Sequence, residues 1–164
     1  MLYCIHMTQS QKKAVFLLRM ALGALFLYAG IAKLMNPEWT SVGYLAGAQT
    51  LSGFYGWLAL PQNITWVDML NEWGLFLVGA TLMLGVGTRI AASLGVLIMA
   101  LYYIPTLNFP YAGEHAYIVD EHIIYIAGFI VLVVFNAGIY WGIDGMIQRS
   151  RQLPTWIKKC LWCK

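Results

Sequence analysis

Four apolar stretches, each long enough or nearly long enough to cross a membrane as a helix, constrain this chain more than any other feature. They cover approximately residues 14–35, 67–85, 88–104 and 119–141, and a bilayer core of about 30 Å needs roughly 20 apolar residues in a helix. Only 10% of the residues are charged and the mean hydropathy is +0.67, whereas soluble domains carry about 25% charged residues. This composition excludes a soluble enzyme, a disordered chain and a disulfide-stapled secreted domain. The sequence therefore predicts an all-α, polytopic membrane four-helix bundle.

The residues between these stretches suit helix ends. Asn36-Pro37 follows the first stretch and Pro105 follows the third, and proline ends a helix. The first stretch contains Arg19 and Lys33 and is longer than a signal-peptide core, so we expect a membrane span rather than a cleaved signal. We divide the chain into an N-terminal segment (1–13), a four-helix membrane domain (14–145) and a basic C-terminal tail (146–164).

The basic residues gather on one side of the predicted bundle. Nine of the ten lysines and arginines lie before or early in the first span, at the turn between the second and third, or after the fourth; the exception is Lys33. Basic residues favour the cytoplasmic side of a membrane. The sequence therefore predicts a plasma-membrane protein with both termini in the cytoplasm, and a net charge of +3 gives no indication of nucleic-acid binding.

The connection between the first two spans is not an ordinary loop. Residues 39–67 include no charged side chain, yet they contain Pro61, several glycines and six tryptophan, tyrosine and phenylalanine residues. A solvated linker would be polar, whereas aromatic side chains favour the membrane interface. We expect an interfacial helix or a re-entrant segment here, which together with the aromatic loop at 105–118 covers the outer end of the bundle.

Ionisable side chains converge at this outer end from several spans. Such groups are costly inside a membrane and need a partner or a role. One interpretation is a solvated rim, because carboxylates are favoured in the first turn of a helix. A metal site is the other, but three consecutive side chains of a helix point in different directions, so we predict no metal. The residues concerned are Lys33, Asp68, Glu72, Glu114, His115, Asp120, Glu121 and His122, with Tyr102 and Tyr103 at the same level.

A second polar group lies at the inner end, where three different spans contribute Arg19, Arg89 and Asp144. Arg19 lies more than a turn inside the membrane, so it needs a partner unless it reaches back to the interface. Asp144 is the carboxylate predicted for that side, with Arg89 as a competitor for it. We interpret this group as a structural ion pair between helices.

The cysteines carry little information. Cys160 and Cys163 form a C-x-x-C pair in the basic tail, a spacing found in redox and zinc sites. No second pair lies near them in the sequence to complete a zinc site. We interpret the pair as part of an ordinary juxtamembrane tail.

Several short blocks resemble the DoxX/DoxD family of membrane proteins, and they occur in the order found in that family. They are Leu18-Arg19-Met20 through Ala32-Lys33-Leu34, Asn71-Glu72-Trp73-Gly74, Gly85-Val86-Gly87-Thr88-Arg89, Val119-Asp120-Glu121-His122 and Gly138 through Asp144. The similarity is closest to the DoxD-like branch, whose members include the membrane subunit of thiosulfate:quinone oxidoreductase. The resemblance implies a four-helix membrane bundle that contacts membrane quinone. Matching the blocks carries over Arg19, Lys33, Glu72, Arg89, Asp120, Glu121, His122 and Asp144.

The resemblance leads to a functional hypothesis, an integral membrane subunit of a respiratory quinone-linked oxidoreductase that acts with a separate partner subunit. Glu72, His122 and Lys33 are then the expected proton-exchanging residues, and Trp73 and Tyr102 are expected to pack against the quinone ring. Asp120 and Glu121 complete the expected quinone site. The alternative is a non-catalytic scaffold or anchor subunit of a larger membrane complex.

Overall fold

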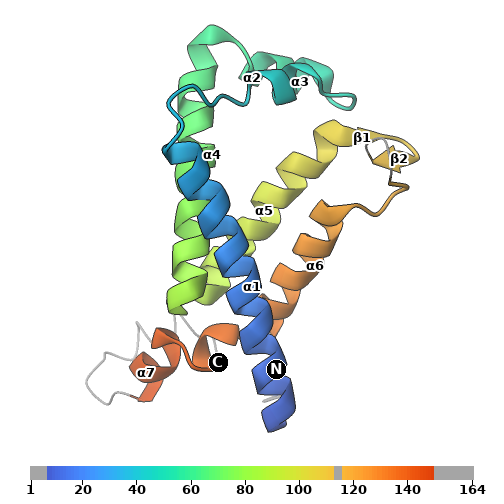
Figure 1. Ribbon diagram of the computed structural model, residues 1–164. Helices are drawn as coiled ribbons and strands as arrows, with labels where there is room; N and C mark the ends of the chain where they lie inside the picture. The colour runs from blue at the N-terminus through green and yellow to red at the C-terminus, as the bar shows by residue number, and fades with distance from the viewer. Residues whose placement is uncertain (1–6, 113–115, 150–164) are drawn as a thin grey trace.

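The computed structural model describes residues 7–112 and 116–149 and shows a helical bundle closed at one end by two short helices (Figure 1). The main helices are α1 (Gln9–Leu34), α4 (Pro61–Leu84), α5 (Thr88–Thr106) and α6 (Glu121–Val134). The remaining elements are α2 (Val42–Ala46), α3 (Ser52–Leu58), the strands β1 (Leu107–Asn108) and β2 (Tyr111–Ala112), the 3-10 helix η1 (Ala137–Ile139) and α7 (Ile143–Arg149). The predicted all-α bundle is thereby confirmed.

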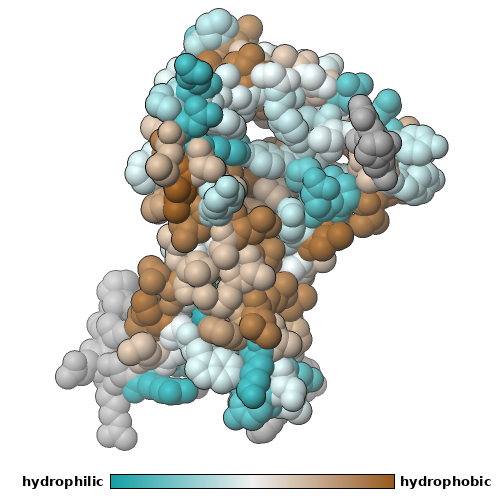
Figure 2. All heavy atoms as spheres, in the orientation of Figure 1, coloured by the Kyte–Doolittle hydropathy of each residue, from teal (hydrophilic) through white to brown (hydrophobic). Residues whose placement is uncertain are grey.

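The bundle has the properties of a multi-pass membrane protein. Three helices, α1, α4 and α5, are long and apolar enough to cross a membrane, and α6 is apolar but shorter, with 14 residues. Figure 2 shows apolar residues around the middle of the molecule and more hydrophilic ones towards both ends. The start of α1 lies at the same end of the bundle as α7, and α2 and α3 lie at the opposite end (Figure 1). We call these the α7 end and the α2–α3 end.

Close helix contacts hold α1 against α4. A Cβ on Gly79 would lie 2.1 Å from the Leu27 backbone nitrogen, and one on Gly30 would lie 2.4 Å from the Phe76 nitrogen. Small residues allow membrane helices to approach in this way when no hydrophobic effect drives them together. On the other side of the core, the Phe129 ring fills the space beside Gly95 and connects α6 to α5.

The fourth span is shorter than predicted. The sequence predicts a span over 119–141, but α6 ends at Val134 and the chain turns, with positive φ angles at Asn136 and Trp141. The turn brings Gly138 so close to α7 that a Cβ there would lie 2.1 Å from Asp144 Oδ2. Residues 137–141 are apolar, so the hydropathy pattern predicts that the fourth span continues through them. Tertiary contacts instead make the chain turn there.

Two further boundaries differ from the prediction, and both involve proline. Helix α4 begins at Pro61 instead of residue 67, because proline suits the first turn of a helix, where its missing N–H is not needed. Pro105 lies within α5 instead of following it. The first difference adds two turns to α4, and these turns pack beside α2 and α3. The second leaves a backbone carbonyl of α5 without its helical partner.

Candidate functional site

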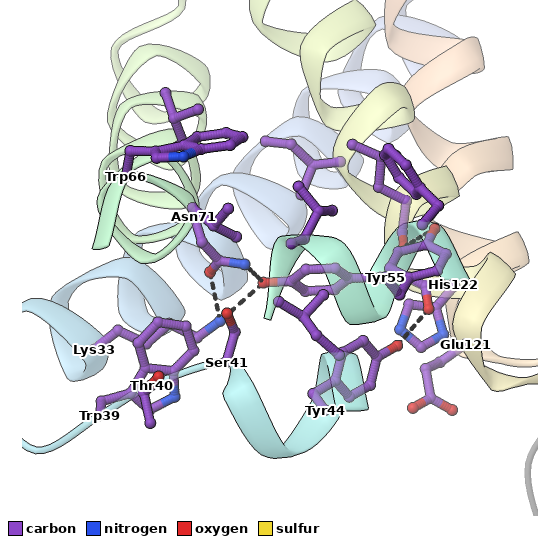
Figure 3. Close-up of a pocket in the computed structure, with 18 residues that line it drawn as sticks. Lys33, Trp39, Thr40, Ser41, Tyr44, Tyr55, Trp66, Asn71, Glu121 and His122 are labelled. Atoms are coloured by element: carbon purple, nitrogen blue, oxygen red, sulfur yellow. Dashed lines mark hydrogen bonds between the residues drawn. The ribbon is translucent and has the colours of Figure 1, made fainter. Parts of the chain in front are cut away.

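A cavity of about 690 Å³ lies at the α2–α3 end, and Figure 3 shows the side chains that surround it. All four main helices contribute to its wall, and α2 and α3 cover it. The segment that covers it is the one predicted to be interfacial or re-entrant. Most of the lining is apolar or aromatic. The lining residues are Lys33, Trp39, Thr40, Ser41, Tyr44, Leu45, Phe54, Tyr55, Leu58, Trp66, Val67, Leu70, Asn71, Ile98, Leu101, Tyr102, Glu121 and His122.

Three polar side chains from three helices meet in the wall of this cavity, and we call them the Lys33 cluster (Lys33, Asn71 and Tyr102). Lys33 Nζ donates to Asn71 Oδ1 at 2.8 Å and to the Tyr102 hydroxyl at 2.9 Å. The Asn71 amide also donates to the Tyr102 hydroxyl. A tyrosine hydroxyl has two acceptor sites and one proton. The Tyr102 hydroxyl therefore accepts two hydrogen bonds, and among residues 7–112 and 116–149 no acceptor binds its proton.

Lys33 also contacts aromatic rings. Its Nζ lies 4.3 Å from the centre of the Trp39 ring and 5.3 Å from the centre of the Tyr102 ring. A desolvated cation gains electrostatic energy from the face of an aromatic ring. These contacts, together with the two hydrogen bonds, explain how an ammonium group is tolerated beside an apolar cavity.

The structure places Asn71 in the position where the sequence predicts Glu72. Helix α4 faces the core through Leu75, Val78 and Leu82, and Asn71 precedes Leu75 by four residues, which puts both on one face. Glu72 points about 100° away and is absent from the cavity lining. The sequence prediction missed Asn71 because it considered charged residues only. The apolar stripe that follows Asn71 on the same face of α4 was visible in the sequence.

Trp73 is also outside the site. Its side chain is 49% exposed and packs edge-on against Phe76 at 5.7 Å, so the expected contact with a quinone ring is not supported. Tyr102 does lie in the cavity wall, as predicted for a residue that packs against a ring. Tyr103 points elsewhere and donates to the Ile118 carbonyl at 2.6 Å.

His122 enters the cavity from the first turn of α6 and is held by Asp120. The Asp120 carboxylate caps α6 by accepting from the His122 and Ile123 backbone nitrogens, and its Oδ2 lies 2.6 Å from His122 Nδ1. The imidazole meets the Tyr102 ring edge-on, with 6.1 Å between the ring centres. Asp120 therefore orients His122 and is absent from the cavity lining. Glu121 is exposed and lies at the cavity edge.

A second, smaller cavity of about 230 Å³ lies on the core side of the same residues. It shares Lys33, Tyr102, Glu121 and His122 with the large cavity, and its remaining lining is apolar apart from the Tyr125 hydroxyl. These four residues therefore contribute to the walls of both cavities.

The short helices are attached to the end of α5 by tyrosine hydroxyl groups. Pro105 has no N–H, so the Leu101 carbonyl lacks its helical donor, and Tyr55 supplies one at 3.0 Å. Tyr44 donates to the next carbonyl, that of Tyr102. Burial raises the pKa of both the Tyr44 and the Tyr55 hydroxyl. Both therefore stay protonated and able to donate throughout the neutral range.

Asp68 anchors the other side of this cover. The sequence places Asp68 in the first turn of a helix, but α4 starts earlier and Asp68 lies in its third turn. Its Oδ1 accepts from the Ser41 backbone nitrogen at 3.0 Å and from the Ser41 hydroxyl at 2.5 Å. Because Ser41 precedes α2, this contact fixes where the covering segment begins.

At the α7 end, Arg19 and Asp144 are both buried, with exposed fractions of 1% and 2%, but they do not form the predicted ion pair. Arg19 donates to the carbonyls of Ala137, Tyr140 and Trp141 at 2.8–3.2 Å. The turn after α6 presents these carbonyls, which hydropathy does not reveal. We call Arg19, Asp144 and the backbone around them the Arg19 cluster.

Asp144 is likewise satisfied by backbone groups. Its two oxygens accept from the Gly87 and Thr88 nitrogens at 2.9 and 3.1 Å, at the start of α5, where a carboxylate is favoured by the helix dipole. Arg89 is partly exposed and forms no salt bridge within the part of the chain that the structure describes. The three residues lie at one end of the bundle, where Arg19 and Asp144 each bind backbone groups instead of each other.

Some predicted residues lie outside the described ranges, namely Glu114, His115, Cys160 and Cys163. Among residues 7–112 and 116–149, no three histidine, cysteine or acidic side chains lie together in a way that could hold a metal ion.

Comparison with known families fits this architecture. The family model for DoxX matches residues 14–106, which include most of α1, the whole of α2, α3, α4 and α5, and the Lys33 cluster. The chain belongs to the DoxX family. No curated protein and no solved structure matches the chain. Membership in the DoxX family agrees with the multi-pass membrane fold.

Proposed function

We propose that this DoxX protein is the quinone-binding membrane subunit of a respiratory oxidoreductase. The observation that supports this proposal best is the Lys33 cluster, which presents a lysine ammonium and a free tyrosine proton to an apolar, aromatic cavity. The cavity volume of about 690 Å³ is in the range of small-molecule sites, which are mostly apolar with a few placed polar groups.

The depth of the site supports a ligand that is soluble in lipid. Lys33 follows Arg19 by 14 positions on one helix, which corresponds to about 21 Å of rise. Because the bilayer core is about 30 Å thick, a site at this distance from Arg19 lies near the far boundary of the hydrocarbon region and within reach of it. A membrane quinone occupies that region.

The residues present suit the head group of a quinone. Lys33 and Tyr102 are donors that would hold a carbonyl oxygen, and aromatic side chains would pack against the ring. His122, oriented by Asp120, would exchange protons with the site. Reduction of a bound quinone to the quinol takes up two electrons and two protons, and we propose that a partner subunit supplies the electrons. The resemblance to the DoxD-like branch makes thiosulfate the electron donor to test first.

The proposal is tested by purifying variants together with their native partner subunits and measuring bound quinone by extraction and chromatography. Lys33→Met removes a charged hydrogen-bond donor, so we expect at least a tenfold loss of bound quinone, because such bonds contribute about 1.5–3 kcal/mol. Tyr102→Phe should lose about fivefold, since a neutral hydrogen bond contributes about 1 kcal/mol. Quinone reduction with thiosulfate is measured on the same samples.

Tyr103→Phe is the matched control, because Tyr103 is the neighbouring tyrosine and its hydroxyl bonds outside the cavity. This variant should keep its quinone within about twofold of the unaltered protein. If Lys33→Met and Tyr102→Phe fold and retain all their quinone, the quinone site is wrong, and a scaffold subunit becomes the better description.

We also propose a plasma-membrane location with the α7 end in the cytoplasm, from the distribution of basic residues. An impermeant thiol reagent should then leave Cys160 and Cys163 unlabelled in intact cells and label them after permeabilisation. Labelling of these cysteines in intact cells would reverse the orientation.

A further inference from the structure

Four apolar side chains line the large cavity and are also strongly exposed at the surface. Leu70 is 60% exposed, Phe54 49%, Leu101 43% and Trp66 41%. Exposed fractions this large include outer surface as well as cavity wall, so we place these side chains where the cavity opens to the surface. Leu70 and Trp66 belong to α4, Leu101 to α5 and Phe54 to α3, so the opening lies between α4 and α5 beneath α3. We call it the α4–α5 opening.

The helices meet on the inner side of this opening. A Cβ on Gly74 would lie 3.4 Å from Ile98 Cδ1, so α4 and α5 are in contact one turn beyond Leu70. Figure 1 shows the two helices separating from there towards α2 and α3. In Figure 3, Trp66 lies on the far side of the cavity from Trp39, Thr40 and Tyr44. The α4–α5 opening is therefore distinct from the side on which Thr40 and Tyr44 are exposed.

The α4–α5 opening lies at the depth of the lipid chains. Leu70 precedes the end of α4 at Leu84 by 14 residues, and Leu101 follows the start of α5 at Thr88 by 13. These separations correspond to about 20 Å of helix rise from the α7 end, well within a hydrocarbon core of about 30 Å. An opening rimmed by leucine, phenylalanine and tryptophan at that depth faces lipid.

We infer that the α4–α5 opening is a lateral entrance from the bilayer, and that the apolar chain of the ligand lies in it while the head group contacts Lys33 and Tyr102. This inference rests on the proposed quinone site and narrows the ligand to quinones that carry an apolar chain. Leu70 and Leu101 are then the residues that contact the chain. They act on specificity and are separate from the residues that bind the head group.

The inference predicts that filling the opening will discriminate between quinones with and without a chain. Leu70→Trp or Leu101→Trp adds bulk at the rim without touching the Lys33 cluster. We expect each variant to bind a long-chain quinone at least tenfold more weakly than the unaltered protein and to bind a chainless quinone within about twofold of it. Binding is measured in nanodiscs, with the partner subunits present, by titration and quantification of retained quinone.

The chain offers matched controls two helical turns away on the same helix faces. Leu77 on α4 and Leu94 on α5 are 53% and 49% exposed and do not line the cavity. Seven residues correspond to about two turns, so Leu77→Trp and Leu94→Trp place the same bulk on the same lipid-facing surface. Both controls should bind the long-chain quinone normally.

A second measurement does not depend on substitution. A quinone with a photoreactive group on the first part of its chain should label peptides that contain Leu70 or Leu101 in the unaltered protein. Equal binding of long-chain quinone by all four tryptophan variants, or labelling confined to the Thr40 and Tyr44 side, would overturn the entrance and leave the quinone site standing. Failure of the unaltered protein to bind any quinone would overturn the proposed function, and the inference with it.

Discussion

Arg19 and Lys33, two cations in the membrane helices, are bound by different kinds of group. At the α7 end, Arg19 donates to three backbone carbonyls of the turn after α6. At the α2–α3 end, Lys33 donates to the side chains of Asn71 and Tyr102 beside a large cavity. Both groups lie in helices that cross the membrane, so both need partners. The difference is whether those partners are fixed parts of the fold.

This comparison teaches how to separate a structural charge from a functional one. Backbone carbonyls are fixed parts of the fold, and a Cβ on Gly142 would lie 2.8 Å from Arg19 Nη1, so the chain is closely packed around the guanidinium group. The Lys33 cluster has a spare tyrosine proton and empty volume next to it. The Arg19 cluster therefore contributes stability, and the Lys33 cluster is suited to exchange a partner for a ligand.

Arg19→Ala is the substitution with the largest expected effect, because it tests whether the Arg19 cluster stabilises the fold. The substitution leaves three carbonyls of a buried turn unpaired, and we expect a loss of about 3–5 kcal/mol in unfolding free energy. Thermal unfolding in detergent and abundance in the membrane measure this loss. Because Arg19 and Asp144 each bind backbone, Arg19→Ala/Asp144→Ala should be no more stable than the weaker single variant.

Arg89→Ala is the control for this test, since Arg89 is partly exposed and forms no salt bridge in the described part of the chain. Its unfolding midpoint should stay close to that of the unaltered protein. If the Arg19→Ala/Asp144→Ala variant were more stable than the single variants, the result would support the direct ion pair that the sequence predicts.

Gly138→Ala tests the close packing of the Arg19 cluster with a single methyl group. The added Cβ would lie 2.1 Å from Asp144 Oδ2 and 2.4 Å from Thr88 Oγ1, so the turn must shift, at a cost of about 1–3 kcal/mol. Gly43→Ala adds the same methyl group in α2, where no atom lies within 4 Å, and should leave stability unchanged. Equal unfolding midpoints for the two variants would show that the cluster is loosely packed.

The sequence was sufficient for the features that depend on composition. The apolar stretches predicted the membrane helices, and the uncharged aromatic segment predicted the cover formed by α2 and α3. Lys33, Tyr102 and His122 were also predicted to lie together, and the structure places them in one cavity. Each of these predictions depends only on residue type and on depth in the membrane. Depth follows directly from the number of residues along a helix.

The sequence was insufficient wherever the rotation of a helix or a backbone group decided the contact. Asn71, and not Glu72, lines the cavity, because the rotation of α4 about its axis depends on its packing against α1. Arg19 binds backbone carbonyls instead of Asp144 because the chain turns at Asn136. This turn lies within the apolar stretch 119–141, which the sequence predicts to be one helix. Neither outcome is encoded in the charge pattern on which the prediction relied.

Asn71→Leu and Glu72→Gln together test which residue of α4 belongs to the Lys33 cluster. Asn71→Leu removes an acceptor from Lys33 and a donor to Tyr102, so quinone binding should fall about tenfold, corresponding to about 1.4 kcal/mol. Glu72→Gln keeps the shape of a side chain that does not line the cavity, so its effect should be smaller than that of Asn71→Leu. A larger loss for Glu72→Gln than for Asn71→Leu would favour the site predicted from sequence over the one in the structure.

The smallest expected effect concerns the cover over the Lys33 cluster, which shares one property with the Arg19 cluster, namely side chains that donate to backbone carbonyls. Tyr55→Phe leaves the Leu101 carbonyl unpaired, because Pro105 offers no N–H, and we expect a loss of about 1 kcal/mol in unfolding free energy. Pro105→Ala supplies that N–H, so Tyr55→Phe should cost less in a Pro105→Ala background. A double-mutant cycle measures this difference.

Tyr28→Phe, at a tyrosine that is 74% exposed, is the control and should change nothing. Strict additivity of Tyr55→Phe and Pro105→Ala would mean that the tyrosine does not replace the missing helical donor, and the cover would then be held by packing alone.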